Sequence, residues 1–248
     1  MNDNPLNLEA ISRSFGSTEV LKDFSLEVAT GEFVAIVGPS GCGKTTLLNL
    51  LAGFDKPTSG RVASKGQMRM VYQQDGLFPW LTVAENIQMG LRQVPDKEKR
   101  ERELRELLAL IRLEGFEGNY PHQLSGGMRQ RAELARALAG DTDTLLLDEP
   151  FSALDYLTRL RLRRELARML KERPRTVVLV THDIEEAAQL ADRVVVLSER
   201  PAHIRCELRL EAERPRDPTH PEVIEAIQRI LTVLGLEHDN GEAEALSL

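Results

Sequence analysis

The segment GPSGCGKTT, residues 38–46, combines glycines with a lysine and two threonines at the spacing of a phosphate-binding loop. Glycines allow successive backbone N–H groups to curl around the β- and γ-phosphates of a nucleotide. The Lys44 ammonium would add a positive charge on these phosphates, and the Thr45 hydroxyl would ligate Mg²⁺. The loop is therefore predicted to bind a nucleotide through Gly38, Ser40, Gly41, Cys42, Gly43, Lys44, Thr45 and Thr46.

Two adjacent carboxylates follow the apolar run TLLL at residues 144–147. An apolar strand that ends at Asp148 would place this carboxylate beside the phosphate loop, where it would hold Mg²⁺. Glu149 could then polarise the attacking water as a general base. Acidic residues at a strand end also cap the helix that follows, so the catalytic interpretation depends on the presence of the phosphate loop. Together the two motifs predict nucleotide hydrolysis.

A second candidate anion site lies in LSGGMRQR, residues 124–131, called here the signature segment. Ser125, Gly126 and Gly127 begin a predicted helix, and the N–H groups at a helix N-terminus bind anions. A chain that already has one phosphate loop has no obvious need for another. We therefore expect these three residues to contact the γ-phosphate of a nucleotide held by a second copy of the chain.

The elements that must position these motifs alternate between strands and helices. The continuous apolar run at residues 33–37 is typical of a strand buried on both faces, and it leads through the phosphate loop into a helix that ends at Gly53. Alternation within residues 5–30 predicts antiparallel strands. Further strands and helices predict a parallel sheet in an α/β chain, with the strands in TLLLDEP, TVVLVTHD and RVVVLS and the helices near 156–172 and 184–190.

Residues 75–140 are predicted to form a helical insertion between sheet strands. Thr82 and Glu85 have the spacing of a capping box for a helix through Leu91, and Asp96 could cap a charged helix after it. The remaining chain adds a peripheral strand in HIRCELRL, a helix in PEVIEAIQRILTVLGL and a polar, frayed end. We expect one domain, with a core lobe at 1–74 and 141–205, a helical lobe at 75–140 and a C-terminal part at 206–248.

Composition narrows the class of protein. A length of 248 residues suits one large domain or two packed lobes, and the net charge of −7 gives no global attraction for nucleic acid. The arginine-rich segment after residue 158 is interrupted by Glu165, so we interpret it as a solvated face. Cys42 and Cys206 cannot form a disulfide framework, which favours a reducing cytoplasm. The beginning of the sequence does not resemble a signal peptide, and the apolar runs fall short of the roughly twenty residues of a membrane helix.

The sequence resembles the ATP-binding subunit of an ABC transporter over nearly its whole length. The motifs GPSGCGKTT, VYQQ, LSGGMRQR, LLLDEP, SALD and THD occur in the order of that family. The resemblance implies an α/β P-loop NTPase fold, in which a RecA-like parallel-sheet core carries an antiparallel β subdomain and an inserted helical subdomain. It also implies ATP and Mg²⁺ as ligands, ATP hydrolysis, and a head-to-tail dimer of two copies that sandwiches the ATP.

The resemblance assigns further residues around the nucleotide. Phe15 matches the aromatic residue that stacks on adenine, with Val20 beside it, although a phenylalanine on an early strand could instead belong to the core. Gln73 matches the glutamine that reaches Mg²⁺ and the attacking water. Gln74 is the competing candidate, but the family pattern places the glutamine directly after an aromatic residue. His182 matches the histidine that contacts the γ-phosphate.

Three details qualify these assignments. The loop SALD, which ends at Asp155, resembles the segment that links the two nucleotide sites across the dimer. Met128 occupies the position where the signature segment usually has glutamine, a form familiar in one importer branch. The Cys42 side chain is expected to face away from the nucleotide. The alternative is an exposed thiol, which would make the ATPase sensitive to alkylation and protected by ATP.

The segment VYQQDGLFPWLTVAEN, residues 71–86, contains the only tryptophan of the chain. Exposed apolar patches usually mark partner sites, and in the resembled family this junction docks a cytoplasmic helix of the permease. Leu77, Phe78 and Trp80 are therefore predicted to bind an integral membrane permease. The alternative is that Trp80 packs inside the helical lobe.

The same segment, together with LSGGMRQR, resembles the nitrate, sulfonate and taurine importer branch. This resemblance implies a peripheral subunit at the cytoplasmic face of the inner membrane, bound to the permease and indirectly served by a solute-binding protein. The alternative is a soluble ABC ATPase that acts on nucleic acid or the ribosome, but such proteins usually have duplicated cassettes, coiled-coil insertions or zinc-binding cysteines. A P-loop kinase or GTPase would have no place for the signature segment or His182.

Overall fold

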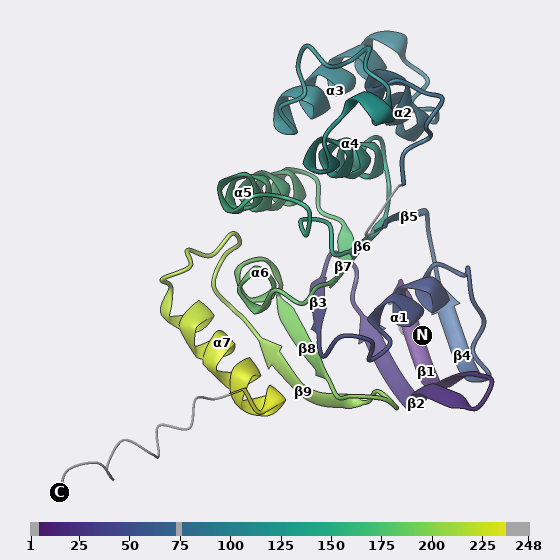
Figure 1. The fold of residues 1–248 in the computed structure, drawn as a ribbon, viewed down its shortest axis with the longest axis vertical. Coiled ribbons are helices and arrows are strands. Elements are labelled where there is room, and N and C mark those ends of the chain that lie inside the picture. The colour runs from purple at the N-terminus through teal and green to yellow at the C-terminus, as the bar shows by residue number, and fades with distance from the viewer. Residues whose placement is uncertain (1–4, 73–75, 237–248) are drawn as a thin grey trace, which may run out of the picture.

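A mostly parallel sheet forms the centre of the molecule, which the computed structural model describes over residues 5–72 and 76–236. The strand order is β5–β6–β7–β3–β8–β9, and only the last pair is antiparallel (Figure 1). In that order the strands are Met68–Val71, Thr144–Asp148, Thr176–Val180, Phe33–Val37, Arg193–Leu197 and Ile204–Arg209.

Both faces of the four central strands (β6, β7, β3 and β8) are buried, and successive residues of a strand belong to different cores. In β3, Phe33, Ala35 and Val37 pack into the core shared with α4–α7, whereas Val34 and Ile36 pack into the core shared with α1 and the N-terminal strands. Side chains alternate between the two faces of a strand, so a strand covered on both faces must be apolar throughout. This explains the uninterrupted apolar runs in the sequence.

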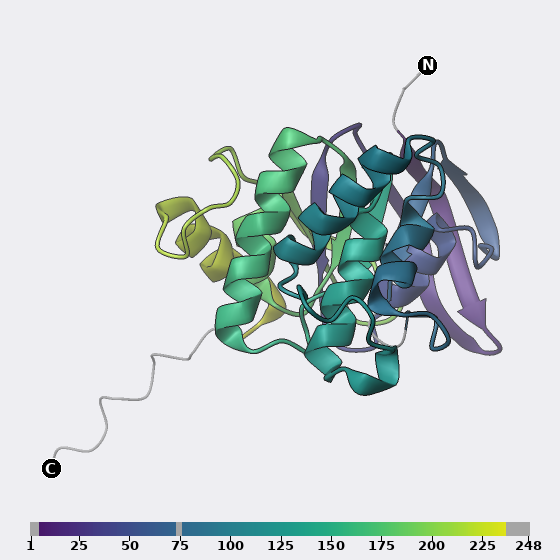
Figure 2. The same cartoon turned by 90° about the horizontal axis from the view of Figure 1, so that it is seen from above.

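A second, antiparallel sheet covers α1, Lys44–Leu51. Its order is β2–β1–β4, with bounds Thr18–Val28, Leu6–Phe15 and Ser59–Ser64. Leu8 of β1 lies opposite Leu26 of β2 and Val62 of β4. Seen from above, this sheet (purple) forms one side of the molecule, and α7 (yellow) lies on the other (Figure 2).

Three helices form a layer at one end of the central sheet (Figure 1). They are α2 (Val83–Gly90), α3 (Lys97–Leu110) and α4 (Gly126–Leu138), with a short 3-10 turn at Pro121–Gln123. The predicted caps are confirmed. Thr82 and Glu85 form a reciprocal capping box, Asp96 accepts the N–H groups of Glu98 and Lys99, and Ser125 accepts the N–H of Met128.

The remaining helices are α5 (Tyr156–Glu172), α6 (Ile184–Leu190) and α7 (Pro221–Leu234). The first two follow β6 and β7, as expected for right-handed crossovers of a parallel sheet, and α7 packs against α6 and β9. Within the described part of the chain, none of the helices combines the length and apolar character needed to span a membrane. The strands β4 and β5 were not predicted, because β4 has the polar sequence SGRVAS and β5 has four residues.

Candidate nucleotide site

The phosphate loop joins the carboxyl end of β3 to α1, and its shape depends on glycine. Gly41 and Gly43 have φ values of 76° and 120°, a region that other residues rarely adopt. A Cβ atom at Gly43 would also lie 2.6 Å from Cγ1 of Val20, the residue predicted to lie near the base. Lys44 is 7% exposed, and its ammonium donates hydrogen bonds to the carbonyl oxygens of Gly38 (2.8 Å) and Pro39 (2.9 Å). The predicted loop residues thus form one compact turn around the lysine.

Oxygen ligands suitable for Mg²⁺ meet beside this loop. Burial raises the pKa of Asp148, while a hydrogen bond with the Thr45 side chain opposes that rise, so the hydroxyl and carboxylate are neighbours. Mg²⁺ prefers oxygen ligands and keeps few protein ligands beside its waters and substrate phosphates. The described residues contain no group of three or more His, Cys, Asp or Glu side chains that could hold a metal. A hydroxyl and one carboxylate therefore fit Mg²⁺ bound together with a nucleotide.

Glu149 and His182 lie together at the carboxyl ends of the neighbouring strands β6 and β7. The His182 Nδ1 atom is 3.0 Å from the Glu149 Oε1 atom, and the histidine side chain is 64% exposed. Glu149 has a φ of 48°, an uncommon conformation that often accompanies a functional constraint. Its N–H donates to the carbonyl of Val180, and its carbonyl accepts from the Ser152 hydroxyl at 3.0 Å. The backbone thus holds the carboxylate toward the histidine.

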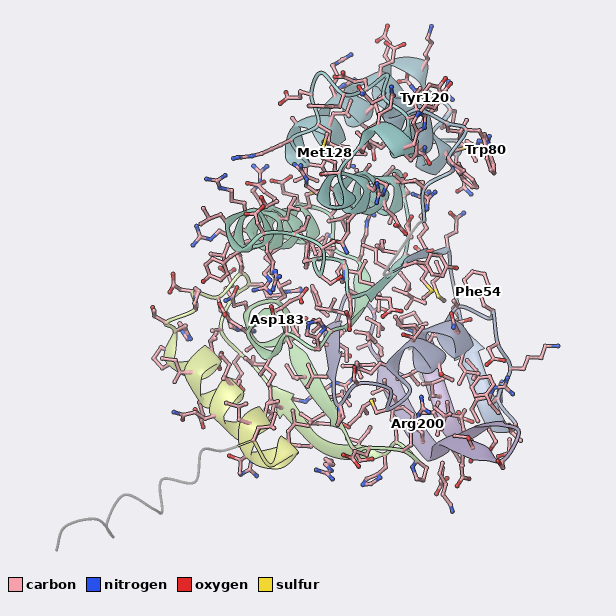
Figure 3. The ribbon with its side chains drawn as sticks, viewed as in Figure 1. Phe54, Trp80, Tyr120, Met128, Asp183 and Arg200 are labelled. Carbon is pink, nitrogen blue, oxygen red and sulfur yellow. The ribbon has the colours of Figure 1, made fainter. Side chains whose placement is uncertain are left out.

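A buried ionic cluster supports the turn that carries His182, and no sequence motif indicated it. Arg159 and Arg163 of α5 both donate to the Asp183 carboxylate, which also caps α6 (Figure 3). Burial would raise the pKa of Asp183, but the Glu186 N–H and the Arg163 charge hold it below the ordinary value. Burial raises the pKa of Glu186 to about 7, and this carboxyl accepts the Thr181 hydroxyl at 2.7 Å. The i, i+4 spacing of the two arginines was the only available signal.

Phe15 and Cys42 occupy contrasting environments near the phosphate loop. Phe15 is 49% exposed, so the alternative of a core phenylalanine is wrong, and the Arg13 guanidinium lies 4.3 Å from its ring centroid. Cys42 is buried in the core beneath the loop, and burial raises the pKa of its thiol. The alternative of an exposed, readily alkylated Cys42 is therefore wrong, because the side chain faces away from solvent.

The signature segment lies away from the phosphate loop of its own chain. Ser125 caps α4 and Gly126 and Gly127 begin it, and Met128 beside them lies in the helical layer (Figure 3). Arg200, whose guanidinium lies beside Gly41, is at the opposite end of the same view. Asp155 caps α5 by accepting the Thr158 N–H at 3.0 Å. One chain therefore does not bring the two anion-binding segments together.

The aromatic part of the segment that follows β5 is largely at the surface. Trp80 is 68% exposed and its ring lies 5.5 Å from that of Phe78, so the alternative of a tryptophan inside the helical layer is wrong. Leu77 is buried, which leaves Phe78 and Trp80 as the available part of the predicted partner surface. Phe78 lines a cleft of about 630 Å³ together with Arg69, Tyr72, Met89 and Arg136, and Trp80 lies beside Phe78. Gln73 and Gln74 lie outside the described residues.

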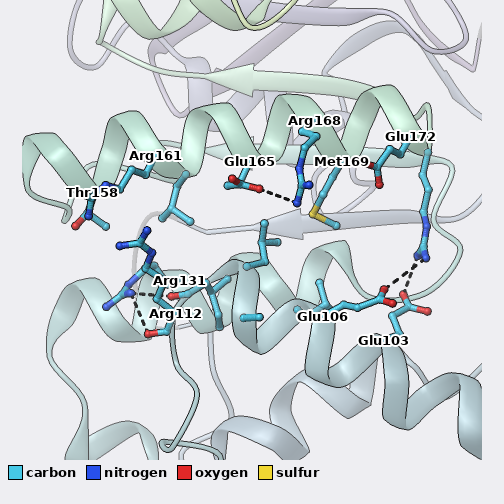
Figure 4. Close-up of a pocket in the computed structure, with 16 residues that line it drawn as sticks. Glu103, Glu106, Arg112, Arg131, Thr158, Arg161, Glu165, Arg168, Met169 and Glu172 are labelled. Atoms are coloured by element: carbon cyan, nitrogen blue, oxygen red, sulfur yellow. Dashed lines mark hydrogen bonds and ion pairs between the residues drawn. The ribbon is translucent and has the colours of Figure 1, made fainter.

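A groove of about 700 Å³ between α3 and α5 contains none of the predicted site residues (Figure 4). Ion pairs cross or line it, including Arg173 with Glu103 at 3.4 Å and Arg168 with Glu165 at 3.0 Å. Arg168 and Arg173 are paired with acidic residues and the Arg131 guanidinium donates to the Ile111 carbonyl, so the groove offers no phosphate-binding set comparable to the loop beside Lys44. The nucleotide site is therefore assigned to the loop and not to this groove.

Comparison with known proteins identifies the family. Residues 21–152 match the family model described as ABC transporter. The chain belongs to the ABC transporter family. An uncharacterized ABC transporter ATP-binding protein of Methanocaldococcus jannaschii is 42% identical over 243 residues, or 92% of this chain and 91% of the relative. An aliphatic sulfonates import ATP-binding protein of Rhodococcus jostii is 48% identical over 217 residues, 85% of each chain.

Other members agree with these matches. A taurine import ATP-binding protein of Pelagibacter ubique is 46% identical over 204 residues, 78% of this chain and 77% of the relative. The dimeric structure of an ATP-binding cassette in a post-hydrolysis state with ADP and Pi covers 84% of this chain and 99% of its own, with a TM-score of 0.74 and 33% identity. The predicted ABC ATPase fold is confirmed, and this chain is an ATP-binding ATPase of the family.

Proposed function

We propose that this chain is the ATP-hydrolysing subunit that powers import of a small solute through a separate membrane permease. The observation that carries the hydrolytic part is the pairing of Glu149 with His182 beside the Thr45–Asp148 pair. The names of the sulfonate and taurine import relatives support the transport part. The solute class we propose is a sulfonate, taurine, nitrate or a related small solute.

The residues take the following roles. Lys44 and the loop N–H groups bind the ATP phosphates, and Phe15 stacks on adenine with Val20 beside it. Thr45 and Asp148 would hold Mg²⁺, with Gln73 as a further ligand, and the ion would neutralise charge on the β- and γ-phosphates. Glu149 accepts a proton from the attacking water, and His182 contacts the γ-phosphate.

Two copies of the chain are proposed to complete two sites. Ser125, Gly126, Gly127 and Asp155 of one copy would contact the ATP held by the phosphate loop of the other. The separation of α4 from the phosphate loop within one chain supports this arrangement, and so does the dimeric form of the related cassette. ATP favours the closed dimer through contacts with both segments, and hydrolysis removes that preference.

Phe78 and Trp80 are proposed to dock the permease, which would hold the chain at the cytoplasmic face of the inner membrane. The exposed tryptophan, its aromatic neighbour Phe78 and the cleft that Phe78 lines support this surface. The proposed division is a core lobe at 1–74 and 141–205, a helical lobe at 75–140 and a C-terminal part at 206–248. The helical layer at one end of the sheet supports it.

Copurification tests this function directly. The tagged chain, coexpressed with the membrane protein encoded beside it, should be recovered with a multispanning protein and should hydrolyse ATP with Mg²⁺. Vesicles containing the complex and its solute-binding protein should accumulate one of the proposed solutes when ATP is supplied. ATPase activity stimulated by RNA or DNA, without a membrane partner, would instead support the nucleic-acid alternative.

A further inference from the structure

Helix α4 carries two nearly buried polar side chains, Gln130 and Glu133, on one face. They are 6% and 3% exposed, and residues three apart on a helix lie next to each other. Neither residue was singled out by the sequence motifs, although Gln130 lies within the signature segment. Burial of such groups is costly unless every polar atom has a partner, so their contacts define what they hold.

Gln130 holds the backbone around the proposed general base. Its Nε2 donates to the Glu149 carbonyl at 3.1 Å and to the Ser152 hydroxyl at 3.3 Å. Its Oε1 accepts the Ala153 N–H at 3.0 Å. The Glu149 residue has a positive φ, which persists only when its surroundings fix it. Gln130 thus joins α4 to the Glu149 backbone and to the loop that leads to Asp155.

Glu133 holds the two residues that flank positions 73–75. Its Oε1 accepts the Tyr72 N–H at 2.9 Å, and its Oε2 accepts the Gly76 N–H at 3.1 Å. A Cβ atom at position 76 would overlap the Glu133 carboxylate, so any side chain there would displace it. Tyr72 and Gly76 also line the cleft beside Phe78. One carboxylate therefore binds the backbone N–H groups of two residues that line the cleft beside Phe78.

The same helix reaches this surface through a third residue. The Arg136 guanidinium lies 5.3 Å from the Phe78 ring centroid, and Phe78 pairs with Trp80. Gln130, Glu133 and Arg136 follow one another at intervals of three residues along α4. A displacement of this helix must therefore move contacts at Glu149 and at the aromatic cleft together, because a helix transmits motion as a rigid element.

We propose that Gln130 and Glu133 are positioning residues that couple the nucleotide site to the Phe78–Trp80 surface through α4. The inference rests on the proposed nucleotide and docking sites and adds the residues that connect them. Glu133 anchors the cleft to the helix, and Gln130 anchors the Glu149 backbone to the same helix. Neither side chain is required to touch the nucleotide or the partner.

Trp80 provides a direct measurement, because it is the only tryptophan of the chain. We expect a non-hydrolysable ATP analogue with Mg²⁺ to change Trp80 fluorescence in the wild-type chain. In Glu133→Gln the single amide oxygen can replace only one of the two carboxylate oxygens, and the NH₂ group would face the other N–H. Gly76→Ala should displace the same carboxylate without changing α4. Both variants should bind the analogue with unchanged affinity but lose most of the Trp80 response.

Gln130→Leu tests the contact between α4 and the Glu149 backbone. It should lower kcat on the order of tenfold or more with little change in KM, because the reacting group is misplaced while ATP binding is retained. The combined effect of Gln130→Leu and Glu133→Gln on the Trp80 response should be smaller than the product of the separate effects. A matched control is Glu103→Gln, which alters another buried glutamate that accepts a backbone N–H, that of Gly140 at 2.7 Å.

The outcomes separate this inference from the proposed function. Failure of the wild-type chain to bind the analogue would overturn the proposed nucleotide site, and the coupling with it. Normal binding with no Trp80 response in the wild type, or with an intact response in both Glu133→Gln and Gly76→Ala, would overturn the coupling alone. An equal loss in Glu103→Gln would also overturn it, since the effect would then follow from any buried glutamate of the helical layer.

Discussion

The Nδ1 atom of His182 lies 3.0 Å from the Oε1 atom of Glu149, although 33 positions separate the two residues in the sequence. The parallel sheet produces this proximity, because β6 and β7 are neighbours and both residues follow the carboxyl ends of these strands. The carboxylate is mostly shielded, whereas the imidazole is largely exposed. In this geometry the Glu149 carboxylate is held in place as a base, and the His182 imidazole is free to contact a phosphate.

Replacing Glu149 with glutamine tests the base directly. The amide keeps the size of the side chain but cannot accept a proton from water, so kcat should fall by about 10²- to 10⁴-fold while ATP affinity is retained. Steady-state hydrolysis, equilibrium ATP binding and the size of the protein with MgATP measure this, and the dimer should persist. The exposed Glu106→Gln variant should behave as wild type. Hydrolysis by Glu149→Gln at the wild-type rate would exclude this residue as the base.

Removing the Phe15 ring should weaken ATP binding more than it slows hydrolysis. Stacking of a base on an aromatic ring contributes about 1–3 kcal/mol, so Phe15→Ala should raise KM for ATP by roughly tenfold or more. Phe54 is also exposed, at 67%, but its ring lies 6.3 Å from that of Tyr72 and it is not predicted to contact adenine. Phe54→Ala should therefore leave KM unchanged. The same KM in wild type and Phe15→Ala would place the base elsewhere.

Truncation of Trp80 should separate ATP hydrolysis from transport. Because Trp80 is exposed, Trp80→Ala removes little from the core and should preserve basal ATPase activity of the purified chain. In vesicles that contain the complex, ATP-driven solute uptake should fall strongly, as for an interface anchor. Ile224→Ala, on the exposed face of α7, is the control. Full uptake with Trp80→Ala would remove this residue from the docking surface.

The buried Glu186 carboxyl should make stability depend on pH in a defined direction. Burial raises its pKa from 4.5 to about 7, opposed by the nearby Arg163 charge and the Thr181 hydroxyl. Between these pH values the folded chain retains a proton that the unfolded chain has released. The unfolding free energy contributed by this group therefore falls by about 3 kcal/mol as pH rises through that window.

Glu186→Gln tests this dependence because the amide does not titrate and can still accept the Thr181 hydroxyl. Chemical denaturation at pH 5 and pH 8 should show that the variant gains stability relative to wild type at the higher pH. Glu225→Gln, at an exposed position of α7, should give the same difference from wild type at both pH values. A Glu186→Gln difference that does not change with pH would show that this carboxyl does not titrate in the window.

The sequence predicted the central strands and most helices because their signals are local. FVAIV is apolar at every position and TVVLV at every position after its threonine, and the caps at Thr82, Asp96 and Ser125 have recognisable spacing. In contrast, β4 and β5 were missed because pairing with distant strands, and not their own composition, makes them strands. Edge strands with exposed polar residues have no distinctive period.

The candidate site likewise contains features that the sequence predicts and features that only the fold reveals. The phosphate loop and the Asp148–Glu149 pair were predicted because their chemistry is contiguous in sequence. The contacts of Gln130 and Glu133 join segments that are far apart in the chain, so only the fold brings them together. Exposure also had to come from the structure. It excluded a core position for Phe15 and Trp80 and an accessible thiol for Cys42.

The contact between Gly76 and Glu133 limits how this chain can diverge. Any side chain at position 76 would overlap the carboxylate at 133, while loss of the carboxylate would remove the need for glycine. The two positions, 57 residues apart, should therefore change in a fixed order during evolution, with the glutamate replaced before the glycine. Descendants that retain Glu133 are expected to retain Gly76. The presence of both residues would therefore indicate that the hydrogen bond between the Gly76 N–H and the Glu133 carboxylate is kept.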